Sequence, residues 1–171
     1  MTQTNVTKDA AKATLTFERI FDASRERVWR AWTDPTELAA WWGPRGWETT
    51  VKRFEFVPGG VWHYCMTCLD PDQGEMFEQE SWGKATFQRI DRPASFTYKD
   101  EFSGADGKTD DTMPAMMIDM EFHEEDGRTR LVSRSVFASA DDYEKVLAMG
   151  VVEGATQTWD RLEEHLNRNA D

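Results

Sequence analysis

The chain has few of the residues on which most catalytic and metal sites depend. Its 171 residues include two cysteines and three histidines, and no two histidines stand in an H-x-x-x-H or H-E-x-x-H spacing. It contains no G-x-S-x-G motif, and no glycine-rich loop precedes a helix in a phosphate-binding pattern. We therefore expect no metal, no cofactor and no catalytic residue of these kinds.

Long apolar runs are also missing. No stretch approaches the roughly 18 apolar residues that a membrane-spanning helix needs, and the polar N-terminus lacks the apolar block of a secretory signal. These absences predict a cytoplasmic protein without a membrane partner. We expect residues 1–12 to form a disordered tail and residues 13–169 a single domain, because a chain of this length buries about two thirds of its unfolded surface in one core.

Basic residues are outnumbered by acidic ones. The chain carries 20 lysines and arginines against 32 aspartates and glutamates, which gives a formal net charge of -12. Such a surface repels phosphate backbones, so we expect no nucleic-acid partner. Solubility, a salt-rich cytoplasm or a basic partner protein would each account for the excess of acid.

The two cysteines, Cys65 and Cys68, form a C-x-x-C spacing that can mark a redox centre or half of a zinc site. Both lie in a segment that reads as a strand, where side chains three residues apart point to opposite faces. No second cysteine pair is present to complete a zinc site. We interpret them as ordinary reduced thiols.

The order of predicted elements begins with one strand and two short helices. Apolar and polar residues alternate over residues 13–21, and a helical pattern follows after a candidate cap at Asp22 or Ser24. From residue 48 the period is two, which predicts about six further strands joined by short turns. Antiparallel pairing is expected because the connections are short.

The last segment, residues 141–168, carries apolar residues every three or four positions and predicts one long helix. Gly150 and Gly154 lie inside this helix, where each should cost about 1 kcal/mol relative to alanine. Their spacing indicates that a strand or a ligand approaches the helix backbone closely. The whole pattern predicts an α+β fold in which a curved antiparallel sheet of six to seven strands wraps around the long helix and leaves a gap.

Four segments, in this order, carry a resemblance to a known family: FDASRERVWRAWTDPTELAAWWGP, FEFVPGGVWHYCM, FHEEDGRTRL and GATQTWDRLEEHL. From about Thr14 to Leu166 the chain resembles the homologue-like branch of the family named after the activator of the heat shock protein 90 ATPase. That branch belongs to the START-like (SRPBCC), polyketide cyclase superfamily. The resemblance implies a helix-grip fold with a cavity for hydrophobic small molecules. The long acidic loop over residues 103–114 departs from the pattern, so we expect an unusual cavity rim.

Strand parity and helix position select the residues expected to line this cavity. Two small serines between apolar residues on one strand face would leave space and supply hydroxyls to a ligand. Of the adjacent tryptophans Trp41 and Trp42, one is expected to plug the cavity mouth and the other to anchor this lid to the sheet. The expected lining residues are Trp41, Trp62, Tyr64, Met66, Trp82, Met116, Ile118, Met120, Ser133, Ser135, Leu147, Gly150 and Gly154.

Three functions are compatible with this reading. The first is non-catalytic binding of a hydrophobic or aromatic small molecule between the sheet and the C-terminal helix. The second is a cyclase-like or hydrolase-like enzyme that uses a cavity carboxylate, for which strand parity offers Glu55 and Asp119. The third is a co-chaperone-like interaction module, against which the lack of room for a second chaperone-binding domain argues. An exposed strand edge could also support a homodimer.

Overall fold

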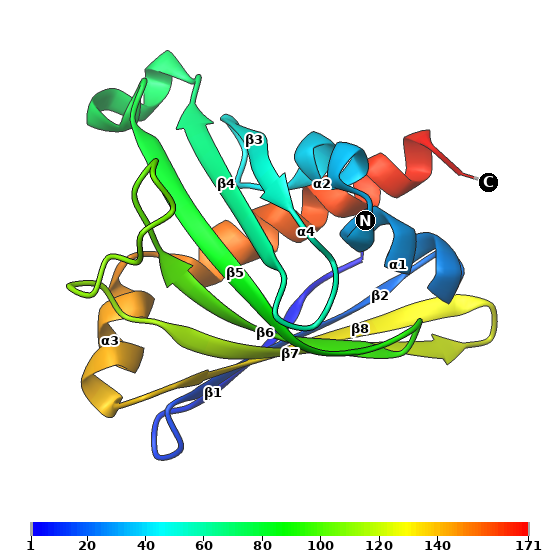
Figure 1. Ribbon diagram of the computed structural model, residues 1–171. Coiled ribbons are helices and arrows are strands. Elements are labelled where there is room, and N and C mark those ends of the chain that lie inside the picture. The colour runs from blue at the N-terminus through cyan, green and yellow to red at the C-terminus, as the bar shows by residue number, and fades with distance from the viewer. Residues whose placement is uncertain (1, 171) are drawn as a thin grey trace.

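The computed structural model describes residues 2–170, which form one curved antiparallel sheet with helices on its concave side (Figure 1). The strands are β1 (Asn5–Asp9), β2 (Thr14–Phe21), β3 (Trp47–Phe54), β4 (Val61–Cys68), β5 (Glu80–Asp91), β6 (Ser95–Phe102), β7 (Met116–Glu125) and β8 (Arg128–Phe137). The helices are α1 (Arg25–Thr33), α2 (Pro35–Trp41), the 3-10 helix η1 (Pro71–Met76), α3 (Ala140–Ala148) and α4 (Val151–Arg168).

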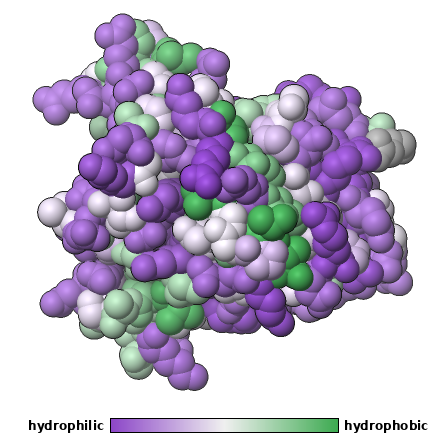
Figure 2. Space-filling view, viewed as in Figure 1, coloured by the Kyte–Doolittle hydropathy of each residue, from purple (hydrophilic) through white to green (hydrophobic). Residues whose placement is uncertain are grey.

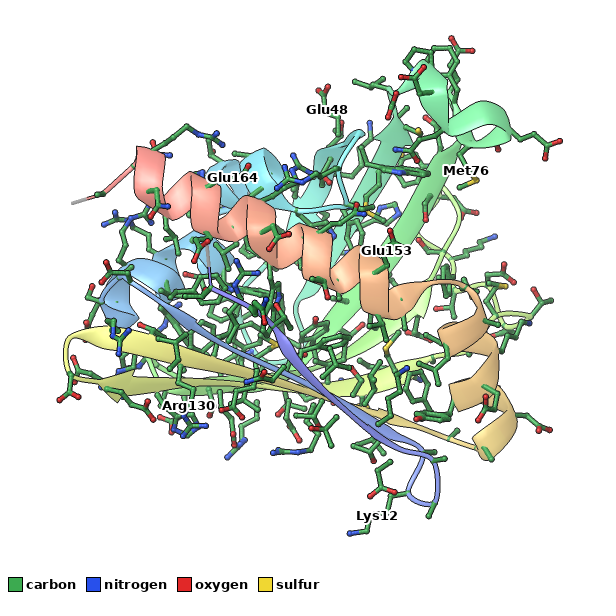
Figure 3. All side chains as sticks on the ribbon, turned by 180° about the vertical axis from the view of Figure 1, so that it is seen from behind. Lys12, Glu48, Met76, Arg130, Glu153 and Glu164 are labelled. Carbon is green, nitrogen blue, oxygen red and sulfur yellow. The ribbon has the colours of Figure 1, made fainter. Side chains whose placement is uncertain are left out.

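The sheet has the strand order β1-β2-β8-β7-β6-β5-β4-β3, and every neighbouring pair is antiparallel. Strands β3 to β8 pair in chain order as a meander, and β2 pairs with β8, so that the first and last strands of the chain lie near the same edge of the sheet. Figures 1 and 3 show the sheet curving so that α4 crosses its concave side. This arrangement confirms the predicted α+β, helix-grip architecture, with eight strands where the sequence predicts six to seven.

The additional strand is β1, which lies in the segment that the sequence predicts to be disordered. It pairs with β2 from Asn5 opposite Glu18 to Asp9 opposite Thr14. The prediction for this segment is wrong because main-chain hydrogen bonds to a sheet edge require no apolar pattern, and the sequence NVTKD has none. Thr4, just before β1, accepts a hydrogen bond from the buried guanidinium of Arg19 at 3.3 Å.

Side-chain caps fix where the two short helices begin. The Ser24 hydroxyl accepts a hydrogen bond from the Arg27 amide and starts α1, as one of the two predicted caps. Asp34 both follows the last residue of α1 and caps α2, where its carboxylate accepts from the amides of Thr36 and Glu37. Pro35 at the first position of α2 suits the helix start because it has no amide to leave unpaired.

The C-terminal segment is two helices, α3 and α4, and the prediction of one helix is wrong at this point. The chain turns at Met149 and Gly150, and Gly150 has φ of +85°, a left-handed conformation. Glycine adopts this conformation without steric cost. Apolar residues continue in phase across the turn, so their periodicity alone did not reveal the break.

Aromatic side chains fill the part of the concave face that lies beneath α1. The Trp29 ring meets Phe122 at a centroid distance of 5.0 Å and Phe96 at 5.6 Å, both edge to face. Phe56, in the loop after β3, packs on Phe96 from another side at 5.4 Å. Aromatic rings therefore fill the space between the sheet and α1. Space for a cavity remains at the opposite end of the concave face, near the start of α4.

Candidate functional site

A cavity of about 270 Å³ lies between the concave face of the sheet and the first turns of α4. We call it the inner compartment. Its residues come from strands β2, β4, β6, β7 and β8, from the α2–β3 connection, and from α1 and α4. They are Phe17, Trp32, Trp42, Gly43, Pro44, Tyr64, Met66, Tyr98, Asp100, Met116, Ile118, Ser133, Ser135, Val151, Gly154, Ala155, Thr158 and Trp159.

Small side chains on both sides explain why this volume is not filled. The backbone of α4 lies nearer to the other helices than to any strand. The residues of α4 that line the cavity, at positions 151, 154, 155, 158 and 159, recur at helical spacing and so lie on one side of the helix. Gly154 has open space where a side chain would begin, with no atom within 4 Å. The expectation that a strand approaches this glycine is therefore wrong, and the open space belongs to the cavity, where the alternative of a ligand stays a prediction.

Two serines of β8 supply hydroxyls on the opposite wall. Ser133 and Ser135 are both buried, and within residues 2–170 neither hydroxyl has a hydrogen-bond partner. The third hydroxyl, that of Thr158, donates to the Gly154 carbonyl at 2.8 Å. Because both serines border the cavity, their hydroxyls are available to a bound molecule.

Asp100 places a carboxylate on the wall of the same cavity. It stands on β6 opposite Ala85 of β5 and Met116 of β7, and it continues the inward series that Phe96 and Tyr98 begin. Burial, with a smaller effect from Glu101, raises the pKa of Asp100 to about 7. Sequence reasoning missed this residue, although the alternation of Phe96, Tyr98, Asp100 and Phe102 was a signal that could have revealed it.

Two buried tyrosines flank this carboxylate. Burial raises the pKa of the Tyr64 and Tyr98 phenols well above their ordinary value, and the negative charge of Asp100 raises both further. Both phenols therefore stay protonated at neutral pH and can donate hydrogen bonds. The Tyr64 ring packs against Trp62 at a centroid distance of 4.5 Å, so its position is set by the core.

Only one of the two adjacent tryptophans, Trp42, borders the cavity. Trp42 lines it, and its ring meets Trp62 edge to face at 4.7 Å and Tyr64 at 5.9 Å. Trp41 is fully buried outside the cavity, where its indole N–H donates to the Ala31 carbonyl at 3.0 Å. Trp41 therefore anchors α2 to α1 and not to the sheet, and the lining residue at this position is Trp42.

Arg161 of α4 holds the turn that follows these tryptophans. Its Nη1 donates to the carbonyls of Trp42 at 3.1 Å, Gly43 at 2.8 Å and Trp47 at 3.2 Å. Desolvation by burial lowers the pKa of Arg161 below its ordinary value, which still leaves it charged. One cation from α4 thus ties residues 42–47, which we call the lid segment and which in part line the cavity, to the helix.

A second cavity of about 220 Å³ adjoins the first, and we call it the outer compartment. It is bordered by β4, β5 and β6 on one side and by the α3–α4 turn on the other. Both compartments have Tyr64, Met66, Asp100, Met116 and Val151 in their walls. Asp100 therefore lies where the two compartments meet.

The residues predicted from sequence divide into three groups. Seven border the inner compartment: Tyr64, Met66, Met116, Ile118, Ser133, Ser135 and Gly154. Trp82 and Gly150 border only the outer compartment, and the Trp82 ring packs on His63 at 5.1 Å, on the other face of the sheet from Tyr64. Four border neither compartment: Trp41, Trp62, Met120 and Leu147.

The two carboxylates considered from sequence lie away from the cavity. Glu55 is exposed and pairs with Arg53 at 2.7 Å. Asp119 accepts a hydrogen bond from the Thr97 hydroxyl at 2.6 Å on the outer face of the sheet. The prediction that these acids could turn inward is wrong, because their apolar neighbours in sequence point inward instead.

The part of the chain that the structure describes offers few groups for redox or metal chemistry. Cys65 and Cys68 are free, buried thiols, and burial raises the pKa of Cys65. Over residues 2–170 no three histidine, cysteine, aspartate or glutamate side chains gather as a metal site would require. None of the helices in this range has the length and apolar character needed to cross a membrane.

Comparisons with known proteins agree with this architecture. The family model described as "Activator of Hsp90 ATPase homolog 1-like protein" matches residues 22–167. Among solved structures, protein Ms6760 from Mycobacterium smegmatis is 32% identical with a TM-score of 0.86, over 99% of this chain and 98% of that chain. A protein from Arthrobacter aurescens is 29% identical with a TM-score of 0.87, over 98% and 93% of the two chains.

A search of curated proteins found no match. The family match spans most of the chain, from the residue that follows β2 almost to the end of α4, and the fold and the similarity to Ms6760 agree with it. The chain belongs to the family of activator of Hsp90 ATPase homolog 1-like proteins.

Proposed function

We propose that the protein binds a hydrophobic or aromatic small molecule in the inner compartment. The observation that supports this most is the make-up of the wall, which combines aromatic and methionine side chains with a few convergent polar groups. Ligand sites in proteins typically have this composition. A volume of about 270 Å³ compares with about 150 Å³ for an engineered cavity that binds benzene, so molecules of one to two rings fit.

The surface agrees with a ligand-binding role more than with a large protein interface. Figure 2 shows one face of the molecule covered mostly by hydrophilic residues, with separate small hydrophobic areas. The exposed apolar residues Leu69, Met76 and Phe77 gather around η1, at the tip of the sheet. A patch of three side chains is small relative to a standard protein–protein interface.

The direct test is a panel of hydrophobic and aromatic metabolites, read by tryptophan fluorescence and thermal melting. Trp32, Trp42 and Trp159 line the inner compartment and should report its occupancy. A ligand at about 100 times its Kd stabilises the folded state by about 2.7 kcal/mol, which for a chain of this size raises the Tm by about 5–10 °C.

Two variants one residue apart provide the matched control. Gly154→Leu places a side chain into the inner compartment, whereas Glu153→Leu adds the same side chain on the exposed side of α4, where Glu153 points away from the sheet (Figure 3). The response should be lost in the first variant and kept in the second. An unchanged response in Gly154→Leu would contradict the proposed site. No response to the panel, with retention on immobilised heat shock protein 90, would favour the interaction module instead.

Asp100 favours an acid–base enzyme as the second candidate function. A carboxyl group whose pKa is about 7 is suited to accept and donate protons near neutral pH. Mass spectrometry of each bound panel compound after prolonged incubation would detect turnover. Product formed by the natural chain and not by Asp100→Asn would support the enzyme, and recovery of every compound unchanged would argue against it.

A further inference from the structure

The Asp100 carboxylate has no partner in the structure. Within residues 2–170 no side chain or amide donates a hydrogen bond to it, and no cation pairs with it. The buried Glu163 and the half-buried Asp160 differ in this respect, since both bind the guanidinium of Arg19. A carboxylate in apolar surroundings without a counter-ion is unfavourable, so Asp100 is a candidate to bind a group from outside the chain.

Among the residues that the structure describes, no lysine, arginine or histidine borders either compartment. The ionisable residues that border the two compartments are Asp100, Glu101 and the tyrosines Tyr64 and Tyr98, and α4 and the α3–α4 turn contribute none. Glu101 lies at the outer compartment and has Lys99 at 3.6 Å, with the lysine half exposed. Over residues 2–170, the ionised form of Asp100 therefore has no positive charge beside it in the cavity wall.

The rings around the inner compartment suit a positively charged group. Trp32, Trp42, Tyr64 and Tyr98 all border it, and the faces of tryptophan and tyrosine rings attract cations, with ammonium ions as the typical ligand. The net charge of -12 also raises the local concentration of cations near the protein. A positively charged ligand is therefore favoured by all three features: the carboxylate, the aromatic faces and the acidic surface.

We propose that the bound molecule carries a protonated amine, with Asp100 as its counter-ion at the junction of the two compartments. This inference depends on the proposed binding function and names the class of ligand. The hydrophobic body occupies the inner compartment, and the ammonium group meets the carboxylate where the outer compartment begins. The hydroxyls of Ser133 and Ser135 remain free for a polar group on the body of the ligand.

The experiment uses matched pairs of probes that share an aryl group and carry either an ammonium group or a hydroxyl. Three arylethylamines (phenyl, indolyl and naphthyl) and the three corresponding arylethanols are titrated into the protein by calorimetry at pH 8. We expect the amine of a binding pair to bind at least tenfold more tightly than its alcohol. Because the amine needs the ionised carboxylate, its advantage should fall by up to tenfold per pH unit below about 7, while alcohol binding stays constant.

Two variants test whether Asp100 is responsible. Asp100→Asn should abolish the amine's advantage, so that amine and alcohol bind with similar affinity, and Glu101→Gln should keep the advantage. A thermal melt of each variant establishes that it is folded. Equal affinity of amine and alcohol in the natural chain, or an advantage that survives Asp100→Asn, would overturn the inference while leaving the proposed binding function intact. No binding of any probe or of the metabolite panel would overturn both.

Discussion

Gly150 and Gly154 lie four residues apart, and replacing each with alanine should change stability in opposite directions. Gly154 is in regular helix in the first turn of α4, and a Cβ there meets no atom within 4 Å. Alanine in a helix is about 0.5–1 kcal/mol more favourable than glycine. Gly154→Ala should therefore raise the free energy of unfolding by about that amount and the Tm by about 1–4 °C.

Gly150 also has open space around a would-be Cβ, but its φ is +85°. A residue with a side chain costs about 1–2 kcal/mol in this left-handed conformation. Gly150→Ala should therefore lower the free energy of unfolding by that amount and the Tm by about 2–8 °C. Space is equal at the two sites, so the backbone conformation alone sets the sign.

Urea unfolding and thermal melting of the two variants, alongside the natural chain, measure both effects. Equal denaturant slopes would establish that the comparison concerns the folded state. If both substitutions changed stability in the same direction, the turn between α3 and α4 would be refuted. If Gly154→Ala were destabilising, some part of the protein would have to approach α4 at that point, and the cavity there would be smaller than described.

Two further predictions concern the cavity wall and its lid. The pKa of Asp100 is raised to about 7 from an ordinary 3.8, so the stability that this group contributes is greatest at low pH and falls as pH rises through 7; Asp100→Asn should therefore raise the Tm more at pH 8 than at pH 5, and equal shifts at both pH values would contradict the assignment. Arg161→Met removes the donors that satisfy carbonyls of the lid segment. Leaving such acceptors unsatisfied costs about 1–3 kcal/mol, so urea unfolding should show a loss of that size; a variant as stable as the natural chain would mean that the lid does not depend on Arg161.

Much of the fold could be predicted from the sequence because its signals are local. Alternating residues in the strands, the Ser24 cap and the Asp34-Pro35 boundary depend on neighbours within a few positions, and the structure has these elements where the pattern indicates. The pairing of β1 is not local in this sense. Its five residues are held by the edge of β2, and nothing in their own composition reveals that partner.

Only some of the residues that line the cavity can be predicted from the sequence in the same way. Parity on β7 and β8 correctly places Ile118, Ser133 and Ser135 on the concave face. It does not say which inward residues fill the core and which border a void, and so Met120 and Trp62 were included although both are packed among other rings and side chains. That distinction depends on how far α4 stands from the sheet.

The sequence by itself determined the curved sheet around a C-terminal helix, the acidic surface and the inward faces of the central strands, because each follows from the composition, order and periodicity of residues. Only the tertiary structure decided that Trp42 and not Trp41 borders the cavity, that α3 and α4 are separate helices, and that Asp100 stands without a counter-ion. A void and an unpaired charge are properties of what surrounds a residue in space. The surroundings are set by segments far apart in the chain, which no local pattern encodes.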